Sequence, residues 1–168
     1  MPEELRPKPP VRLNNKRIEK PAAPTTVTPN TTTIPTTTNP QELDRNRAMY
    51  AWESIQSVKS KKFPDKYGSL ARKMPTLIQV NGLAQTLAYL KAKGKENDPK
   101  KEHFVQAFDH LSGWICNNRL KSGTGDLLAR VLVMDSQTYR FVTNEALAFL
   151  QWLKRFAEAE LATEDENQ

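Results

Sequence analysis

From residue 41 onward, the apolar side chains of this chain recur every three or four positions. That period places them on one face of an α-helix, as in residues 42–60, where Leu43, Ala51 and Ile55 share a stripe. We find no internal repeat and no strand-rich stretch. The sequence therefore predicts an all-α fold, a compact bundle of about five to six helices.

The predicted helices are separated by prolines, glycines and short polar runs. Their expected ranges are 42–60, 65–74, 76–92, 99–120, 126–134 and 136–161. We expect the second helix to stop before Pro75, because proline cannot donate a backbone hydrogen bond. The segment 76–92 is apolar on nearly all sides, which indicates the helix that the others enclose most.

The dipeptide Asn81-Gly82 offers a different interpretation of that segment. Asn-Gly is the strongest short signal for a β-hairpin, and residues 76–80 before it could form a strand. The residues after it, however, repeat at three and four positions rather than at two. We therefore predict a helix with a weak point at Gly82 and keep the hairpin as the minority alternative.

The first 40 residues have a different composition from the rest. They hold nine of the twelve prolines, and nine threonines lie between Thr25 and Thr38. Such a segment cannot bury enough apolar surface to offset its conformational entropy. We expect a disordered arm over 1–40, a helical domain over 41–162 and an acidic tail over 163–168.

Asn30 begins a glycosylation sequon, and a Thr/Pro-rich run can be an O-glycosylated stalk, but both require export. We find no apolar signal region at the N-terminus and no apolar run of membrane-spanning length, so we expect a cytoplasmic protein without a membrane partner. Cys116 follows Trp114 and Ile115, and we expect it in the core or at its edge rather than acting as a nucleophile.

The charge is unevenly distributed along the chain. Residues 1–40 hold six Lys/Arg and three Asp/Glu, residues 41–161 hold nineteen and thirteen, and residues 162–168 hold three acidic residues only. The three parts thus carry +3, +6 and −3, which sum to the formal net charge of +6. A basic body is typical of proteins with a polyanionic partner, although many basic proteins bind nothing charged.

The sequence offers little for catalysis, and we expect no enzyme, no cofactor and no metal. His103 and His110 are seven residues apart, which separates them by about 10.5 Å along a helix, too far to share a metal ion. The run 122–126, Ser-Gly-Thr-Gly-Asp, lacks the Gly-Lys-Ser/Thr ending of a phosphate loop. A helix connector is the simpler interpretation.

The last predicted helix has one narrow polar strip opposite a very wide apolar face, which Trp152 extends. The strip consists of Arg140, Asn144, Gln151 and Arg155, and Lys154 borders the apolar face. Guanidinium and amide groups on one stripe suit contacts to phosphate and sugar, but they would serve a protein–protein contact equally well.

A second set of basic residues lies around the end of the first predicted helix and along the next. The members of this set are Lys59, Lys61, Lys62, Lys66, Arg72 and Lys73. Another cluster holds Lys91, Lys93 and Lys95. Each lysine taken alone is more simply a solvated surface residue, but together with Arg140, Gln151, Lys154 and Arg155 the first set forms our candidate RNA-binding surface.

Two long blocks of the sequence resemble a known family. Residues 66–93, KYGSLARKMPTLIQVNGLAQTLAYLKAK, and 143–161, TNEALAFLQWLKRFAEAEL, look like the hallmark blocks of the small helical subunit of the type III-B CRISPR effector, the Cmr complex. The register also agrees at 45–55 and 134–143. The similarity spans roughly 43–161, and residues 1–40 have no counterpart that we recognise.

The resemblance implies an all-helical, non-catalytic subunit that stacks beside the backbone subunits and helps to hold target RNA. The implied partners are those backbone subunits, the large polymerase-like subunit, further copies of itself, and target and guide RNA. The alternative is a helical protein–protein adaptor without direct RNA contact. A small hydrolase is a more distant third hypothesis.

Overall fold

The computed structural model describes residues 39–94, 98–121 and 125–161, all within the structural unit Thr32–Gln168. The expected arm, apart from its last two residues, and the expected acidic tail lie outside the described residues. The described part forms six α-helices without a β-strand, which confirms the all-α prediction. The helices are α1 (Pro40–Lys59), α2 (Pro64–Asn81), α3 (Leu83–Gly94), α4 (Glu102–Gly113), α5 (Leu127–Val131) and α6 (Ser136–Glu160).

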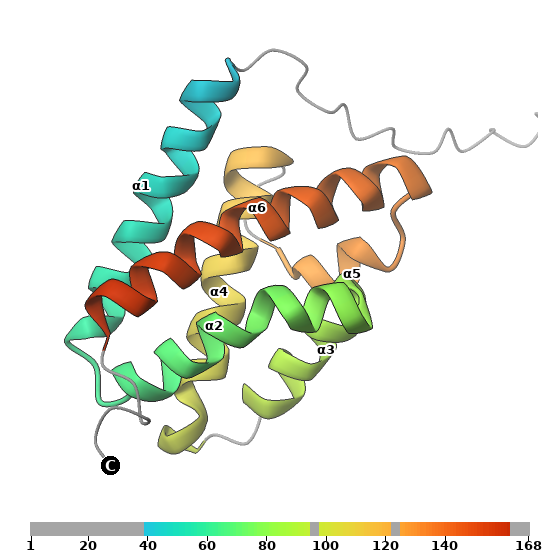
Figure 1. The fold of residues 1–168 in the computed structure, drawn as a ribbon. Helices are drawn as coiled ribbons and strands as arrows, with labels where there is room; N and C mark the ends of the chain where they lie inside the picture. Colours follow the sequence, from blue (N-terminus) through green and yellow to red (C-terminus); the bar gives the residue numbers. More distant parts are fainter. Residues whose placement is uncertain (1–38, 95–97, 122–124, 162–168) are drawn as a thin grey trace, which may run out of the picture. The chain divides into compact units, whose positions relative to one another are not determined.

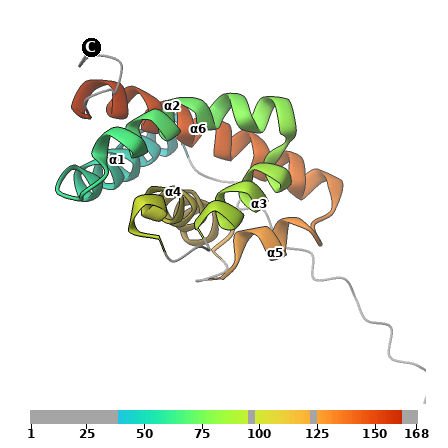
Figure 2. The ribbon, with the colours of Figure 1, turned by 90° about the horizontal axis from the view of Figure 1, so that it is seen from below.

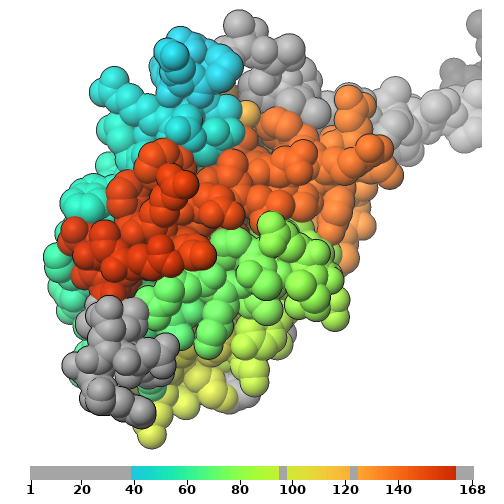
Figure 3. All heavy atoms as spheres, in the orientation of Figure 1, coloured from blue at the N-terminus to red at the C-terminus, as the bar shows by residue number. Residues whose placement is uncertain are grey.

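Helix α6 is the longest element and packs against both α1 and α2 (Figure 1). Helix α3 packs against α4 and α5, and α2 also contacts α3 and α4. Figure 2 shows α2 and α6 together on one side, with α3, α4 and α5 on the other. In the space-filling view, α6 lies between α1 and α2 on the face in sight (Figure 3). None of the described helices is long and apolar enough to cross a membrane.

Polar side chains fix the starts of three of these helices. Asn39 accepts a hydrogen bond from the backbone N–H of Gln41, and Pro40 occupies the first helical turn. At the start of α5, Asp126 accepts a hydrogen bond from the backbone N–H of Leu128. At the start of α6, Asp135 accepts hydrogen bonds from the backbone N–H groups of Gln137 and Thr138. These contacts satisfy donors that a helix leaves unpaired at its first turn.

The predicted helix 99–120 is one run of three helical types. A 3₁₀ turn, η1 (Pro99–Lys101), leads into α4, and a π-helical turn, η2 (Trp114–Arg119), follows it. The π turn places Trp114 in the core, stacked on Phe149 of α6 at a centroid distance of 5.7 Å. Cys116 in the same turn is buried, as predicted.

The prediction that the second helix stops before Pro75 is wrong. Helix α2 continues through Pro75 to Asn81. Proline removes one hydrogen bond of the helix, at a cost of about 3 kcal/mol. Pro75 itself is buried, together with Met74 and Ile78 on the same helix, so packing on both sides of the proline offsets that loss.

The predicted helix 76–92 is divided at Gly82, and neither part is the enclosed helix we expected. Gly82 has φ 83° and ψ 162°, a conformation that is essentially restricted to glycine. Its N–H still bonds to the carbonyl of Ile78, while its own carbonyl accepts from Thr86 of α3. Val80 just before it is 75% exposed. The weak point at Gly82 is thus a complete helix break, and the hairpin alternative is wrong.

One feature of α6 was not predicted: a buried glutamate on its apolar face. Glu145 accepts hydrogen bonds from Arg47 of α1 at 2.7 and 3.0 Å and from the Trp114 indole at 3.1 Å. The Nε of Arg119 lies 3.1 Å from Glu145 Oε2 as an ion pair, without the alignment of a hydrogen bond. Burial alone would raise the pKa of Glu145, but the two arginines outweigh it and the pKa lies below its ordinary value. This cluster holds α6 in a fixed rotation against α1 and η2.

Candidate functional site

The predicted polar strip of α6 lies on its solvent side. Arg140, Asn144, Gln151 and Arg155 are all exposed. The opposite side of the helix, which includes Val142, Phe149 and Leu153, is fully buried. Because an α-helix rises 1.5 Å per residue, Arg140 and Arg155 mark the ends of a strip about 22 Å long. A strip of this length can meet several successive groups of an extended ligand.

The two guanidinium groups of this strip are available for a ligand. Neither Arg140 nor Arg155 forms an ion pair with any residue of the described ranges. The Arg155 guanidinium lies 5.6 Å from the centre of the Trp152 ring, and that ring is partly buried. Lys154, the fourth candidate of α6, lies 3.8 Å from Glu158 in an exposed pair that contributes little. The strip therefore combines two cations and two amides without an acid between them.

The residues of the candidate cluster 59–73 have different environments in the structure. Lys59 forms an ion pair with Glu160 at the end of α6, at 2.7 Å. Lys61 and Lys62 are exposed in the connection between α1 and α2. Arg72 is half-buried, and its Nη1 is buried without a hydrogen-bond partner among the described residues.

Lys66 and Lys73 form a separate site on α2. They are seven residues apart and exposed, and with Ser69 and Leu70 between them they line one wall of a groove. The groove has a volume of about 350 Å³. The spacing of three, four and seven residues is the spacing of one helical face.

The other walls of this groove come from α3, η1 and α4. They consist of Tyr89, Lys100, His103 and Phe104. Lys100 was missing from our candidate set because it is far from Lys66 in sequence and follows a polar break. The signal that could have identified it is the Asp98-Pro99 pair, in which Asp98 caps the turn that carries Lys100. The sequence thus identified two of the three lysines of the groove.

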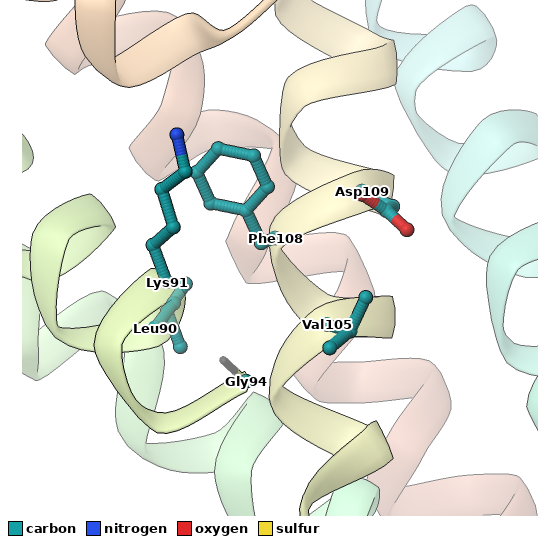
Figure 4. Close-up of a pocket in the computed structure, with 6 residues that line it drawn as sticks. All are labelled: Leu90, Lys91, Gly94, Val105, Phe108 and Asp109. Atoms are coloured by element: carbon teal, nitrogen blue, oxygen red, sulfur yellow. The ribbon is translucent and has the colours of Figure 1, made fainter. Parts of the chain in front are cut away.

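A second hollow, of about 240 Å³, lies between α3 and α4. Figure 4 shows the Lys91 side chain alongside the ring of Phe108, and the ammonium lies 5.9 Å from the ring centre. Lys91 is also paired with Asp126. Lys93 is exposed, and Lys95 lies outside the described residues. Because its lysine is already neutralised, this hollow is a weaker anion site than the groove at Lys66.

His110 lies in a chain of hydrogen bonds. The Tyr67 hydroxyl is hydrogen-bonded to His110 Nδ1 at 2.7 Å, and His110 Nε2 lies 3.3 Å from the Ser57 hydroxyl. The Ser57 hydroxyl donates its proton to the carbonyl of Ser54. Burial lowers the pKa of His110 to about 4. The Ser57 proton is directed to a backbone carbonyl and not to the imidazole, an arrangement that does not activate a nucleophile. Within the described residues no group of three His, Cys, Asp or Glu could hold a metal ion.

Comparison with known proteins connects this fold to one family. Residues 43–160 match the family model described as CRISPR-associated protein (Cas_Cmr5). The chain is similar to the CRISPR system Cmr subunit Cmr5 of Thermotoga maritima, with 30% identity over 70% of this chain and 84% of the relative. It is also similar to the Cmr5 subunit of Thermus thermophilus, with 27% identity over 67% of this chain and 90% of the relative. The crystal structure of a CRISPR-associated Cmr5 family protein from Thermus thermophilus superposes with a TM-score of 0.60 and 25% identity, covering 71% of this chain and 97% of that one.

Proposed function

Because this chain belongs to the CRISPR-associated Cmr5 family, we propose that it is the small, non-catalytic subunit of a type III-B Cmr effector complex. In that role it stacks beside the backbone subunits and helps to hold target RNA during antiviral defence in the cytoplasm. Its partners are those subunits, the large polymerase-like subunit, further copies of itself, and the guide and target RNA. Family membership supports the assembly, and the surface of the chain supports the contact with RNA.

The observation that carries the RNA contact is the exposed strip of α6. Arg140 and Arg155 are exposed and make no ion pair with described residues, and Gln151 lies between them. A guide–target duplex presents the same phosphate geometry whatever its sequence. Arginines and amides on a rigid helix suit such a sequence-independent contact, because they bind phosphate and sugar rather than base edges.

The adaptor alternative is favoured by a different surface. Trp52 of α1 is 41% exposed and packs edge-on against Phe156 of α6 at 5.3 Å, and Met49 on the same helix is 51% exposed. Exposed tryptophan and methionine side chains are enriched in protein–protein interfaces. This surface can bind a neighbouring subunit even if the strip on α6 never touches RNA.

The test is the double variant Arg140→Glu/Arg155→Glu within the assembled complex. We expect helicity and assembly like wild type, because both positions face solvent, and a reduction of target-RNA cleavage of at least about tenfold, since each charge reversal replaces attraction of phosphate by repulsion. The matched control is Arg45→Glu/Lys93→Glu, which reverses two exposed cations outside the strip. Wild-type cleavage by the strip variant would exclude the strip as the RNA surface. Failed assembly would support the adaptor instead.

A further inference from the structure

We infer that the groove between α2, α3 and the start of α4 binds one nucleotide unit of single-stranded RNA, with phosphate at its lysines and the base on Tyr89. This inference rests on the proposed function, which it extends from a general RNA contact to a particular site and ligand. The groove is separate from the α6 strip, because none of its lining residues belongs to α6.

Three ammonium groups from two different elements line the groove. Lys66 and Lys73 come from α2, and Lys100 comes from η1 on another wall. None of the three forms an ion pair with a described residue, and none of the described residues that line the groove is acidic. Like charges around one concavity repel each other, and a phosphate between them removes that repulsion. The electrostatics of the groove therefore select an anion.

The same groove offers an aromatic surface. Tyr89 is 40% exposed and meets Phe104 edge-on at a centroid distance of 5.7 Å. Phe104 is packed in turn against the ring of His103, at 4.2 Å. Tyr89 is thus held in place by the rings behind it while part of its own ring remains open to solvent. A base can stack on such a ring without ordering it first.

The combination of lysines and an aromatic ring distinguishes RNA from other anions. A phosphopeptide site would present arginine clusters, which bind phosphate in a bidentate manner, and would not require a stacking ring. A paired duplex keeps its bases stacked on one another, so only an unpaired nucleotide can place its base on Tyr89. The groove volume of about 350 Å³ is at the lower end for ligand pockets, which fits one nucleotide rather than a longer segment.

The experiment measures binding of a fluorescein-labelled oligouridylate of six nucleotides to the full-length chain by fluorescence anisotropy. We expect Tyr89→Ala to weaken binding by about fivefold or more, the loss typical of one stacked base, while Tyr89→Phe retains the ring and binds like wild type. Lys66→Gln/Lys73→Gln should weaken binding and reduce the slope of log affinity against log salt by about 0.7, for the one phosphate contact that is lost. The matched control, Lys93→Gln/Lys121→Gln, removes two exposed charges outside the groove.

The outcomes separate this site from the proposed function. If Tyr89→Ala and the groove lysine variant bind like the control while Arg140→Glu/Arg155→Glu loses affinity, the groove inference is wrong and the strip remains the RNA surface. If the groove variants bind RNA normally but fail to join the Cmr complex, the groove is a protein contact and the inference is equally overturned. Absence of hexamer binding by the wild-type chain also overturns it, whereas the cleavage assay still tests the strip. If Tyr89→Phe binds RNA like wild type, the loss of affinity in Tyr89→Ala comes from removal of the aromatic ring.

Discussion

Glu145 is the residue on which the buried polar contacts of this fold converge. It receives hydrogen bonds from Arg47 and Trp114 and an ion pair from Arg119, so three elements meet at one carboxylate. A buried charge is costly unless it is paired, and here the Glu145 carboxylate is paired with the guanidinium groups of Arg47 and Arg119. Removing the carboxylate therefore leaves two buried guanidinium groups without their counterion.

We predict that Glu145→Gln lowers the free energy of unfolding at pH 7 by about 3–5 kcal/mol, the cost of breaking a buried ion pair. The folded-state pKa of Glu145 is depressed, so its contribution is complete above the unfolded pKa of about 4.5 and is lost as the pH falls through the folded value. The difference between wild type and variant should consequently shrink in acid. Urea denaturation across this pH range measures both effects.

Glu158→Gln is the matched control, because Glu158 lies on the same helix, is exposed and pairs only weakly with Lys154. It should change stability by less than about 0.5 kcal/mol. An equal loss in both variants, or a difference that does not depend on pH, would contradict the role assigned to the buried cluster.

At the scale of elements, the corner between α2 and α3 depends on a single glycine. Gly82 adopts a backbone conformation that other residues rarely adopt, yet the nearest atom to an added Cβ is the Tyr139 hydroxyl at an ordinary 3.6 Å. The requirement for glycine is therefore one of backbone conformation and not of space.

We predict that Gly82→Ala destabilises the chain by about 1–3 kcal/mol, the cost of a residue held in this region. Thermal unfolding followed by circular dichroism measures it, with Gln85→Ala at an exposed position of α3 as the control that should change little. A Gly82→Ala variant as stable as wild type would mean that the corner can relax into a continuous helix.

The same corner shows what the sequence could and could not predict. The helical period and the start of α6 follow from the local sequence pattern, because they depend on local contacts. The continuation of α2 through Pro75 depends on packing that only the folded chain provides. The burial of Glu145 was missed for the same reason, although a carboxylate one residue before buried Ala146 on an apolar face was a visible signal.

For the candidate site, the strip of α6 was predictable because it is one face of one helix. The groove was not, since Lys100 and Tyr89 meet Lys66 and Lys73 only after α3 and α4 pack against α2. Within the candidate cluster 59–73, Lys59 is paired with Glu160, and Arg72 is not among the residues that line the groove with Lys66 and Lys73.

Taken as a whole, the molecule is a basic helical subunit, and we propose that it holds RNA through phosphate contacts rather than through base recognition. Residues 41–161 carry a net charge of +6, and the strip and the groove place unpaired cations on two separate parts of the described surface. Such a surface binds through counterion release, so its affinity must depend on salt and not on sequence.

The most direct measurement of this claim is the salt dependence of binding between the isolated chain and single-stranded RNA of two unrelated sequences. We expect weak binding that is equal for both sequences, with log affinity falling linearly with log salt at a slope of about −0.7 per phosphate neutralised. In Arg140→Gln/Arg155→Gln the slope should flatten by about 1.4, or 0.7 for each lost contact. An affinity that does not depend on salt concentration, or a slope identical in wild type and variant, would contradict RNA binding through these arginines and favour the adaptor hypothesis.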